Sequence, residues 1–396
     1  MTPTPPSPST RRGFTLIELL VGAVTTTIIL SAVAMTFVGV QGTYQAESRI
    51  KVAVEGMRTA TGFIEQRLRM AGYGVDPRFA FDFNATVLPN NAKANHTIVF
   101  GAGIPNTVTD DLAFRYRDPS WMRRGSYVGG AGIQLATGST FGMSFPRGQR
   151  FIVSCIGGRD YLVLRTTAGG VSKDANGSAN FTVDTALSSV SSDTPCLAKQ
   201  GEASPYVLLL HETRIRVVSM GGRPFLMAFN GLDELDMTSA VPLAADVESF
   251  QVAYVMNRPP LGGPNAGVPA VDARSSVVNW VLGDVGSVDG DRFPDPATVP
   301  APRYQTPYED GSRYNRHPAN IRGVRVSIGI RSTSPEPNGR RAFARVDLED
   351  AGEAATEDGY YRTNMTTTVR VSNLLSRSAF NPPVGDKDSG LNVWGG

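Results

Sequence analysis

Apolar residues dominate the chain from Phe14 to about Val40, and Glu18 is the one charged residue among them. An α-helix rises by about 1.5 Å per residue, so roughly 20 apolar residues cross the hydrocarbon layer of a membrane. We therefore predict one membrane-spanning helix over residues 14–40, with a carboxylate near its start. An ordinary signal anchor is the alternative, but such an anchor does not need an acid in this position.

Between residues 50 and 71 the apolar positions recur at alternating steps of four and three, which places them on one helix face. We predict that the same helix continues as an amphipathic half over residues 41–75 and packs on a sheet. Gly72 or Gly74, followed by Pro77, is expected to end it. A coiled coil is the weaker alternative, because the seam is short and contains a threonine. The face consists of Ile50, Val54, Met57, Thr61, Ile64, Leu68 and Ala71.

Beyond Phe79 the pattern changes to short segments of alternating apolar and polar residues, of which 324–331 is the clearest. Strict alternation predicts a strand with one buried and one solvated face. The chain is therefore predicted to be α+β, with the long N-terminal helix packed on an antiparallel sheet and an enlarged β-rich body over residues 76–396. Long loops are expected at about 167–205 and 257–320, which are rich in Gly, Ser, Pro, Asn and Asp. The other predicted strands are 111–116, 150–155, 161–166, 206–211, 214–218, 224–229, 247–256, 342–347 and 364–371.

Charge is almost balanced along the chain. The 38 basic residues exceed the 36 acidic ones by two, and Arg11 and Arg12, within a proline-rich segment over residues 1–13 that has no acid, account for this excess. The remainder, 36 against 36, creates no basic field that would attract nucleic acid. The two arginines before an apolar helix instead predict a cytoplasmic N-terminus and a body on the other side of the membrane.

The chain has two cysteines, Cys155 and Cys196. In a body exported across a membrane, two cysteines most simply form one disulfide bond. The disulfide would close a loop of 42 residues, from Cys155 to Cys196. In the chain-entropy model, closing a loop of this length stabilises the fold by about 4 kcal/mol. Two buried free thiols are the alternative.

The segment from Gly13 to Val21, Gly-Phe-Thr-Leu-Ile-Glu-Leu-Leu-Val, resembles the class III signal of type IV pilins and type II secretion pseudopilins. The resemblance implies that residues 1–13 are a leader, that a prepilin peptidase cuts between Gly13 and Phe14, and that the same enzyme methylates the new Phe14 amine. It also implies that Glu18 directs docking into a filament. A Phe14 amine released by this cut is expected about one helical turn from Glu18, in the same subunit or in a neighbour.

Further segments resemble the PilW family of large minor pilins. They are the helix end 65–73 and the later segments 245–254, 321–326 and 366–373. The resemblance implies a subunit that primes pilus assembly, sits at or near the tip, and supports twitching motility and adhesion. The implied partners are the major pilin, other minor pilins and a PilY-family tip adhesin, with the inner membrane as the location before assembly. A J-type pseudopilin at the tip of a type II secretion pseudopilus is the alternative, although such bodies are usually smaller.

No constellation of catalytic residues is evident. The three histidines, His96, His211 and His317, lie far apart in the sequence without a second ligand at zinc spacing. The chain contains neither a phosphate-binding glycine loop with Lys-Ser/Thr nor a Gly-x-Ser-x-Gly elbow. We therefore predict no enzyme activity and no cofactor. The alternative to a structural subunit is a membrane-anchored enzyme, but only the generic loops of the chain favour it.

Four aspartates, Asp284, Asp289, Asp291 and Asp295, lie in one glycine-rich segment and could supply oxygen ligands to calcium. A solvated loop is the preferred interpretation, because the segment lacks the EF-hand pattern and contains Arg292.

A second cluster, 114–124, mixes aromatic and basic residues and could bind single-stranded DNA by stacking. Nucleic acid is the less favoured partner there, below a protein contact or an edge strand guarded by charge.

Overall fold

The structure is a computed structural model that describes residues 13–75, 80–81, 96–98, 107–129, 132–135, 149–154, 161–173, 179–183, 205–230, 240–256, 281–282, 321–335, 348–349 and 359–375. It contains one long N-terminal α-helix followed by antiparallel strands, which confirms the predicted α+β class. The chain forms two compact units, residues 1–52 and 53–396.

Helix α1 (Leu16–Leu68) runs without interruption through the predicted apolar half and through the predicted amphipathic half as far as Leu68, seven residues short of the predicted end at 75. The stretch Leu16–Gln41 is long and apolar enough to cross a membrane, and its side chains are exposed. The threonine and serine hydroxyls of this stretch donate to the carbonyl oxygens three or four residues earlier, as in Thr26 to Gly22 at 2.7 Å. These bonds satisfy hydroxyl groups that would otherwise be costly in an apolar environment.

The part of α1 that belongs to the second unit buries the predicted apolar face. Met57, Thr61, Ile64 and Leu68 are all buried there. The helix lies against β14 (Arg362–Arg370), because the Thr367 hydroxyl donates to Glu65 Oε1 at 2.8 Å.

The helix ends at Leu68, and turns follow it as far as Val75. Gly72 has a φ of +79° and Gly74 a φ of +65°, a left-handed conformation that side chains with a Cβ rarely adopt. The Gly72 N–H donates to the Arg115 carbonyl at 2.9 Å, which fixes the helix end on strand β3 (Leu112–Gly129).

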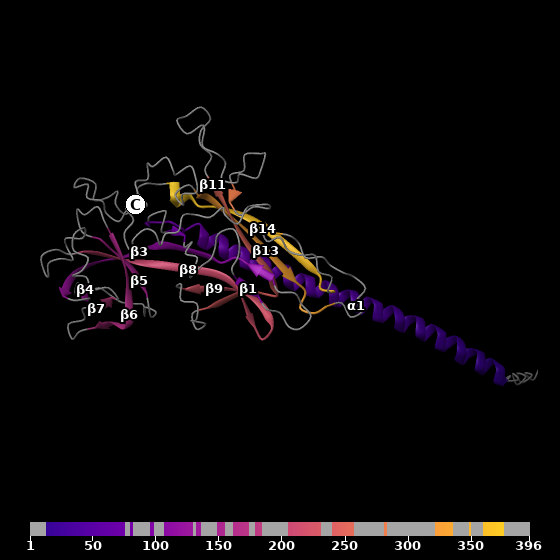
Figure 1. Cartoon of the computed structure of the whole chain (residues 1–396). Coiled ribbons are helices and arrows are strands. Elements are labelled where there is room, and N and C mark those ends of the chain that lie inside the picture. The colour runs from indigo at the N-terminus through magenta and orange to yellow at the C-terminus, as the bar shows by residue number, and fades with distance from the viewer. Residues whose placement is uncertain are drawn as a thin grey trace, which may run out of the picture. The chain divides into compact units, whose positions relative to one another are not determined.

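A four-stranded antiparallel sheet has the order β12-β11-β13-β14 (Figure 1). Its other strands are β11 (Val247–Met256), β12 (Val281–Leu282) and β13 (Ile321–Arg331). The apolar face of β13 is buried as predicted, but its opposite face is partly covered rather than solvated. Ser327 and Arg331 are buried on that face, and the Ser327 hydroxyl donates to Glu349 Oε1 at 2.7 Å. Glu349 therefore accepts the hydrogen bond that Ser327 would otherwise make to water, although the alternating pattern predicted a solvated face.

The second large sheet has the order β10-β9-β8-β3-β4-β7-β6-β5, and β5 also pairs with β8. This extra pairing closes β8, β3, β4, β7, β6 and β5 into a ring, a small antiparallel barrel, from which β9 and β10 extend along β8 (Figure 1). The strands are β3 (Leu112–Gly129), β4 (Gly132–Leu135), β5 (Arg150–Ser154), β6 (Tyr161–Lys173), β7 (Ala179–Val183), β8 (Tyr206–Met220), β9 (Arg223–Asn230) and β10 (Val241–Ala245). A separate hairpin joins β1 (His96–Ile98) to β2 (Thr107–Thr109).

Asp110 and Asp246 lie where the two large sheets meet. Asp246 alone separates β10 from β11. The N–H of Asp110 donates to the Phe250 carbonyl at 2.7 Å, and its Oδ2 accepts from the Val252 N–H at 2.7 Å. Asp110 thereby covers part of the outer edge of β11 in the way that another strand would.

The structure corrects the predicted extent of several strands. Segments 206–211 and 214–218 are one strand, β8, because Glu212, the charged residue between them, is paired with Arg115 inside the protein. The predicted loop 167–205 contains the end of β6 and all of β7, and the predicted loop 257–320 contains β12. The predicted strand 342–347 lies outside the described residues.

Candidate functional site

The start of α1 contains the residues of the predicted processing signal. Gly13, Phe14 and Thr15 precede the first helical residue, Leu16, and Gly13 and Phe14 are exposed. A Cβ added to Gly13 would meet no atom within 4 Å. The peptide bond between Gly13 and Phe14 therefore lies in an accessible, non-helical segment directly before the helix.

Thr15 and Glu18 cap the helix reciprocally. Oε2 of Glu18 accepts hydrogen bonds from the Thr15 N–H at 3.0 Å and from the Thr15 hydroxyl at 2.9 Å. The Glu18 N–H in turn donates to Thr15 Oγ1 at 3.3 Å. This is the capping box of helices that begin with Ser/Thr-x-x-Glu. A carboxylate in the first turn also interacts favourably with the positive end of the helix dipole.

The capping box changes the interpretation of Glu18. Within one chain its carboxylate already has two donors from Thr15, although both residues remain exposed. Pairing with a Phe14 amine after cleavage stays a prediction, and it would add a charge to an acid that is already hydrogen-bonded. The spacing of Thr15 and Glu18 is itself a sequence signature of such a cap, which the prediction for Glu18 overlooked.

The other predicted site residues lie outside the described part of the chain. This applies to both cysteines of the predicted disulfide, Cys155 and Cys196, and to the acidic calcium candidates Asp284, Asp289, Asp291 and Asp295. Within the described residues, no three His, Cys, Asp or Glu side chains are grouped so that they could hold a metal ion.

The aromatic and basic segment 114–124 is buried only in part, since Pro119, Ser120, Met122 and Arg124 are exposed. Phe114, Arg115, Tyr116, Arg117 and Trp121 are all buried. Their rings and guanidinium groups are therefore not available to stack on nucleic acid bases. The expectation of an edge strand guarded by charge is wrong, because β3 pairs with β8 on one side and its residues Arg115 and Arg117 hydrogen-bond to the backbone after α1 on the other.

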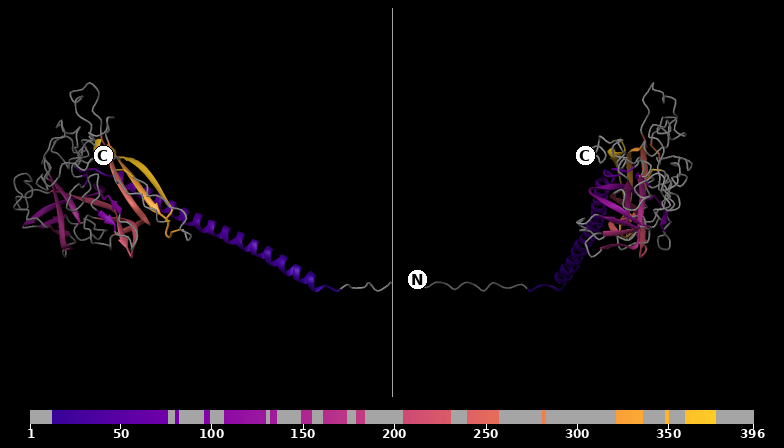
Figure 2. Two further views of the ribbon diagram at one scale, coloured as in Figure 1. Left: turned by 45° about the vertical axis from the view of Figure 1, so that its right-hand side comes forward. Right: turned by 90° about the vertical axis from the view of Figure 1, so that its left-hand side faces the viewer.

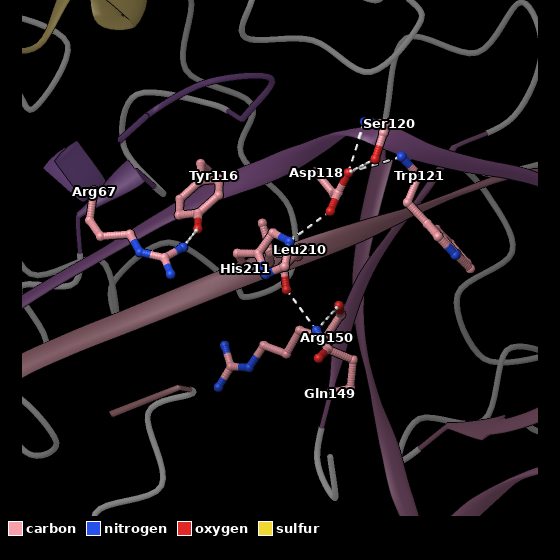
Figure 3. Close-up of polar contacts among 9 residues, drawn as sticks. All are labelled: Arg67, Tyr116, Asp118, Ser120, Trp121, Gln149, Arg150, Leu210 and His211. Atoms are coloured by element: carbon pink, nitrogen blue, oxygen red, sulfur yellow. Dashed lines mark hydrogen bonds and ion pairs between the residues drawn. The ribbon is translucent and has the colours of Figure 1, made fainter. Parts of the chain in front are cut away.

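A polar cluster forms where this segment meets β8 and the end of α1 (Figure 3). Tyr116 and His211 are direct partners across β3 and β8, and their rings stack with centroids 5.0 Å apart. His211 Nε2 lies 2.9 Å from Asp118 Oδ2, and Arg67 donates to the Tyr116 hydroxyl at 3.0 Å. The cluster thus links the last turn of α1 to the barrel through three strand residues.

Asp118 organises a local turn as well as holding His211. Its Oδ1 accepts from the Ser120 N–H at 2.8 Å, the Ser120 hydroxyl at 2.7 Å and the Trp121 N–H at 3.0 Å (Figure 3). Partial burial opposes ionisation of this carboxyl, but the hydrogen bonds from His211 and Ser120 prevail and lower the pKa of Asp118. The turn allows β3 to bulge between Arg117 and Met122 while β8 continues regularly.

The arrangement of this cluster differs from a catalytic triad. In a triad the serine hydroxyl faces the imidazole, and the carboxylate holds the other ring nitrogen. Here Ser120 and His211 both bind the carboxylate of Asp118, so the Ser120 hydroxyl does not face the imidazole. The cluster is best explained as a structural connection, and the candidate functional site remains the start of α1.

No protein-family model matches this chain, and no curated protein matches its sequence. Among solved structures, the chain is similar to a type IV-like pilin from Thermus thermophilus, with 14% sequence identity and a TM-score of 0.21. The similarity covers 58% of this chain and 85% of that chain. At this TM-score the helices and strands of the two proteins do not superpose over most of their length, and the function proposed below rests on the residues of this chain.

Proposed function

We propose that this chain is a type IV pilin-like subunit that is processed at Gly13–Phe14 and assembles through its N-terminal helix. The observation that carries the proposal is the start of α1. An exposed Gly13–Phe14 bond outside the helix precedes a capped helix whose apolar stretch is long enough to cross a membrane. The first unit therefore has what a peptidase acting at the membrane surface requires, which is an accessible bond followed by an anchored helix.

The exposed apolar side chains of this helix support assembly. Phe14, Leu16, Ile17 and Leu19 are each more than two-thirds exposed. Such side chains need lipid or other helices around them. In a filament, neighbouring subunits would replace the lipid, and Glu18 would add a polar contact that only a correctly placed partner satisfies.

Within this class we propose a PilW-type minor pilin that primes assembly at or near the tip, together with the major pilin, other minor pilins and a PilY-family adhesin. Support comes from the size of the second unit, which spans residues 53–396 and contains both a barrel and a separate sheet. A body of this size is difficult to repeat along a thin fibre and is easier to accommodate at an end. The location before assembly would be the inner membrane, with the N-terminus in the cytoplasm and the body outside. A J-type pseudopilin of a type II secretion system shares the same processing signal and remains the second candidate.

The test of processing is mass spectrometry of the full-length protein made in cells with a prepilin peptidase. We expect a mature N-terminus at a methylated Phe14. Gly13→Ala should still be cut at least in part, whereas a bulky residue in Gly13→Val should block the approach of the peptidase to the backbone. Recovery of an intact Met1 end from the exported protein would overturn the proposal.

The test of assembly compares Glu18→Ala with Glu55→Ala, which removes an exposed acid from α1 beyond the apolar stretch. Both variants should be cleaved normally. Only Glu18→Ala should be depleted from sheared filaments, as measured by quantitative immunoblotting. Equal amounts of the two variants in filaments would refute the docking role of Glu18.

A gene deletion separates the two candidate machines. Loss of twitching motility with normal secretion of exoproteins is expected for a pilus subunit. Intact twitching motility with loss of exoprotein secretion would instead identify the chain as a pseudopilin.

A further inference from the structure

β14 is the outermost strand of the four-stranded sheet, drawn in yellow in Figures 1 and 2. It pairs with β13 through nine consecutive residue pairs, from Gly323–Arg370 to Arg331–Arg362, with no shift of register. The pair just beyond this range is hydrogen-bonded, because the Val371 N–H donates to the Arg322 carbonyl. Hydrogen-bonded and non-bonded pairs alternate in an antiparallel ladder. The backbone groups of even-numbered residues in β14 therefore point away from β13.

Four of these outward residues, Asn364, Thr366, Thr368 and Arg370, have exposed side chains. Within the described residues, their outward N–H and C=O groups have no backbone partner. They form a regular row of donors and acceptors, which is the surface that another strand needs in order to add to a sheet.

The other sheet edges in the described part of the chain are short or guarded. β10 contains Pro242, which has no N–H, and its pairing with β9 shifts register after that proline. β12 has two residues, and β5 is covered by β8. Proline and bulges are common devices against unwanted strand pairing. β14 has no proline, no lysine and no bulge, and no described residue pairs with its outer edge from Asn364 to Arg370.

We propose that β14 binds an extended segment of a different polypeptide, which adds to the sheet as a fifth strand. Its recognition follows from the edge. Threonines in the middle of β14 favour threonine or β-branched residues opposite them, and the exposed Arg370 at the end favours a carboxylate. The occupant is therefore a β-prone segment with an Asp or Glu across from Arg370.

A second copy of this chain fits the edge poorly. Symmetric antiparallel pairing that uses the whole strand is centred on Thr366, and it places Arg362 of each copy opposite Arg370 of the other. Arg370 then faces no carboxylate, because β14 contains no Asp or Glu. Arg362 is also fixed in the sheet, since its Nη2 donates to Glu248 Oε1 at 3.1 Å.

The test uses the full chain in its native cells, with the photo-crosslinking residue p-benzoylphenylalanine at Asn364 or Thr368. Crosslinked peptides are then mapped by mass spectrometry. We expect both positions to crosslink to one segment of one other protein, at points about four residues apart, because paired strands advance together. The same crosslinker at Val241, which is exposed on the guarded edge β10, should give no crosslink to that segment.

Two substitutions test the contacts themselves. With the crosslinker at Asn364, Thr368→Pro should lower the yield about tenfold through the loss of one backbone donor, whereas Thr368→Val should not change it. Arg370→Glu, which leaves the backbone intact, should lower the yield about threefold by opposing the carboxylate. Crosslinks to a second copy of this chain, crosslinks scattered over unrelated segments, no crosslink at all, or a yield unaffected by both Thr368→Pro and Arg370→Glu would each overturn the proposal.

This inference does not depend on the proposed role in a filament. Processing at Gly13 and the presence of the chain in sheared filaments are measured in the same strains without the crosslinker. A chain that is absent from filaments but crosslinked through β14 would contradict the proposed function alone. A chain that enters filaments without a crosslink at β14 would contradict the edge contact alone.

Discussion

The carboxylate of Asp246 forms two hydrogen bonds with the guanidinium of Arg223, from Nη2 to Oδ2 at 2.7 Å and from Nε to Oδ1 at 3.2 Å. Asp246 is the single residue between β10 and β11, and its φ of +59° lies in the left-handed region. The hydroxyl of Thr333 also donates to Oδ2, at 3.2 Å. One strained residue thus makes the passage from one sheet to the other, and its side chain is held from two sides.

We expect Asp246→Ala to lower the free energy of unfolding by about 2–4 kcal/mol, because alanine in this conformation costs about 1–2 kcal/mol and the lost hydrogen bonds account for the rest. Asp246→Asn should cost less, since asparagine tolerates positive φ and keeps one acceptor. Asp246→Gly should lie between the two. Thermal unfolding of the full chain in detergent would check this order, and an alanine variant as stable as the asparagine variant would contradict it.

Asp110 is a buried acid that gives a prediction about pH. Desolvation raises the pKa of its carboxyl to about 7, with the charges of Asp111 and Glu349 adding to the effect and the hydrogen bond from Val252 opposing it. The folded state therefore holds a proton that the unfolded state releases near pH 4. The contribution of Asp110 to stability is largest at low pH and is lost as the pH rises from about 4 to about 7.

Asp110→Asn cannot ionise and keeps an acceptor for the Val252 N–H. Its melting temperature should exceed that of the native chain by about 2 °C or more near about pH 8.5 and by much less near about pH 5, where most of the contribution of Asp110 is still present. Asp246→Asn is the control, because that carboxylate faces Arg223 instead of two acids, and its effect should be similar at both pH values. A difference for Asp110→Asn that does not change with pH would show that the proton is absent.

Asp111 and Arg214 form a fully buried ion pair, with Nη2 and Oδ2 2.6 Å apart. Arg216 also approaches Asp111, at 3.5 Å. Asp111→Ala should lower the free energy of unfolding by about 3–5 kcal/mol, because it leaves a buried guanidinium without its counter-charge. The double variant Asp111→Leu with Arg214→Met should cost less than the sum of the single changes. Additive effects in urea unfolding would refute the coupling.

Gly72 and Gly62 form a matched pair in and just after α1. A Cβ on Gly72 would lie 2.5 Å from Leu374 Cδ2 at a φ of +79°, whereas a Cβ on Gly62 would meet nothing within 4 Å. Gly72→Ala should therefore lower stability by about 2 kcal/mol or more. Gly62→Ala should raise it by about 0.5–1 kcal/mol, because alanine is the better helix former. Opposite shifts in melting temperature are expected, and shifts of the same sign would contradict this interpretation of the helix end.

Elements with a clear local signal could be predicted from the sequence. The segment 247–256 has the bounds of β11, since its apolar residues follow one period between polar flanks. Gly221 and Gly222 mark the turn between β8 and β9, and both have positive φ. The buried face of α1 follows from a spacing that a helix alone satisfies.

Elements that depend on distant partners could not be predicted. Glu212 interrupts the apolar pattern of β8, yet it is buried because Arg115 and Arg150 pair with it from two other strands. The contact between His211 and Asp118 joins residues 93 positions apart, and nothing local indicates it. The processing motif of the candidate site can be predicted because it is a short contiguous pattern. The open edge of β14 cannot be predicted, because it depends on which strands lie beside it in the sheet.

Closure of the barrel has a consequence for when the protein can fold. β8 completes pairings with β3 and β5, in which Asp111 meets Arg214 across 103 positions and Gln149 meets Leu210 across 61. Contacts this distant slow folding, since the chain loses loop entropy before the contacts reward it. During synthesis, β3 and β5 therefore lack their hydrogen-bonding partner until β8, which ends at Met220, has been made. The barrel cannot close strand by strand as the chain is synthesised.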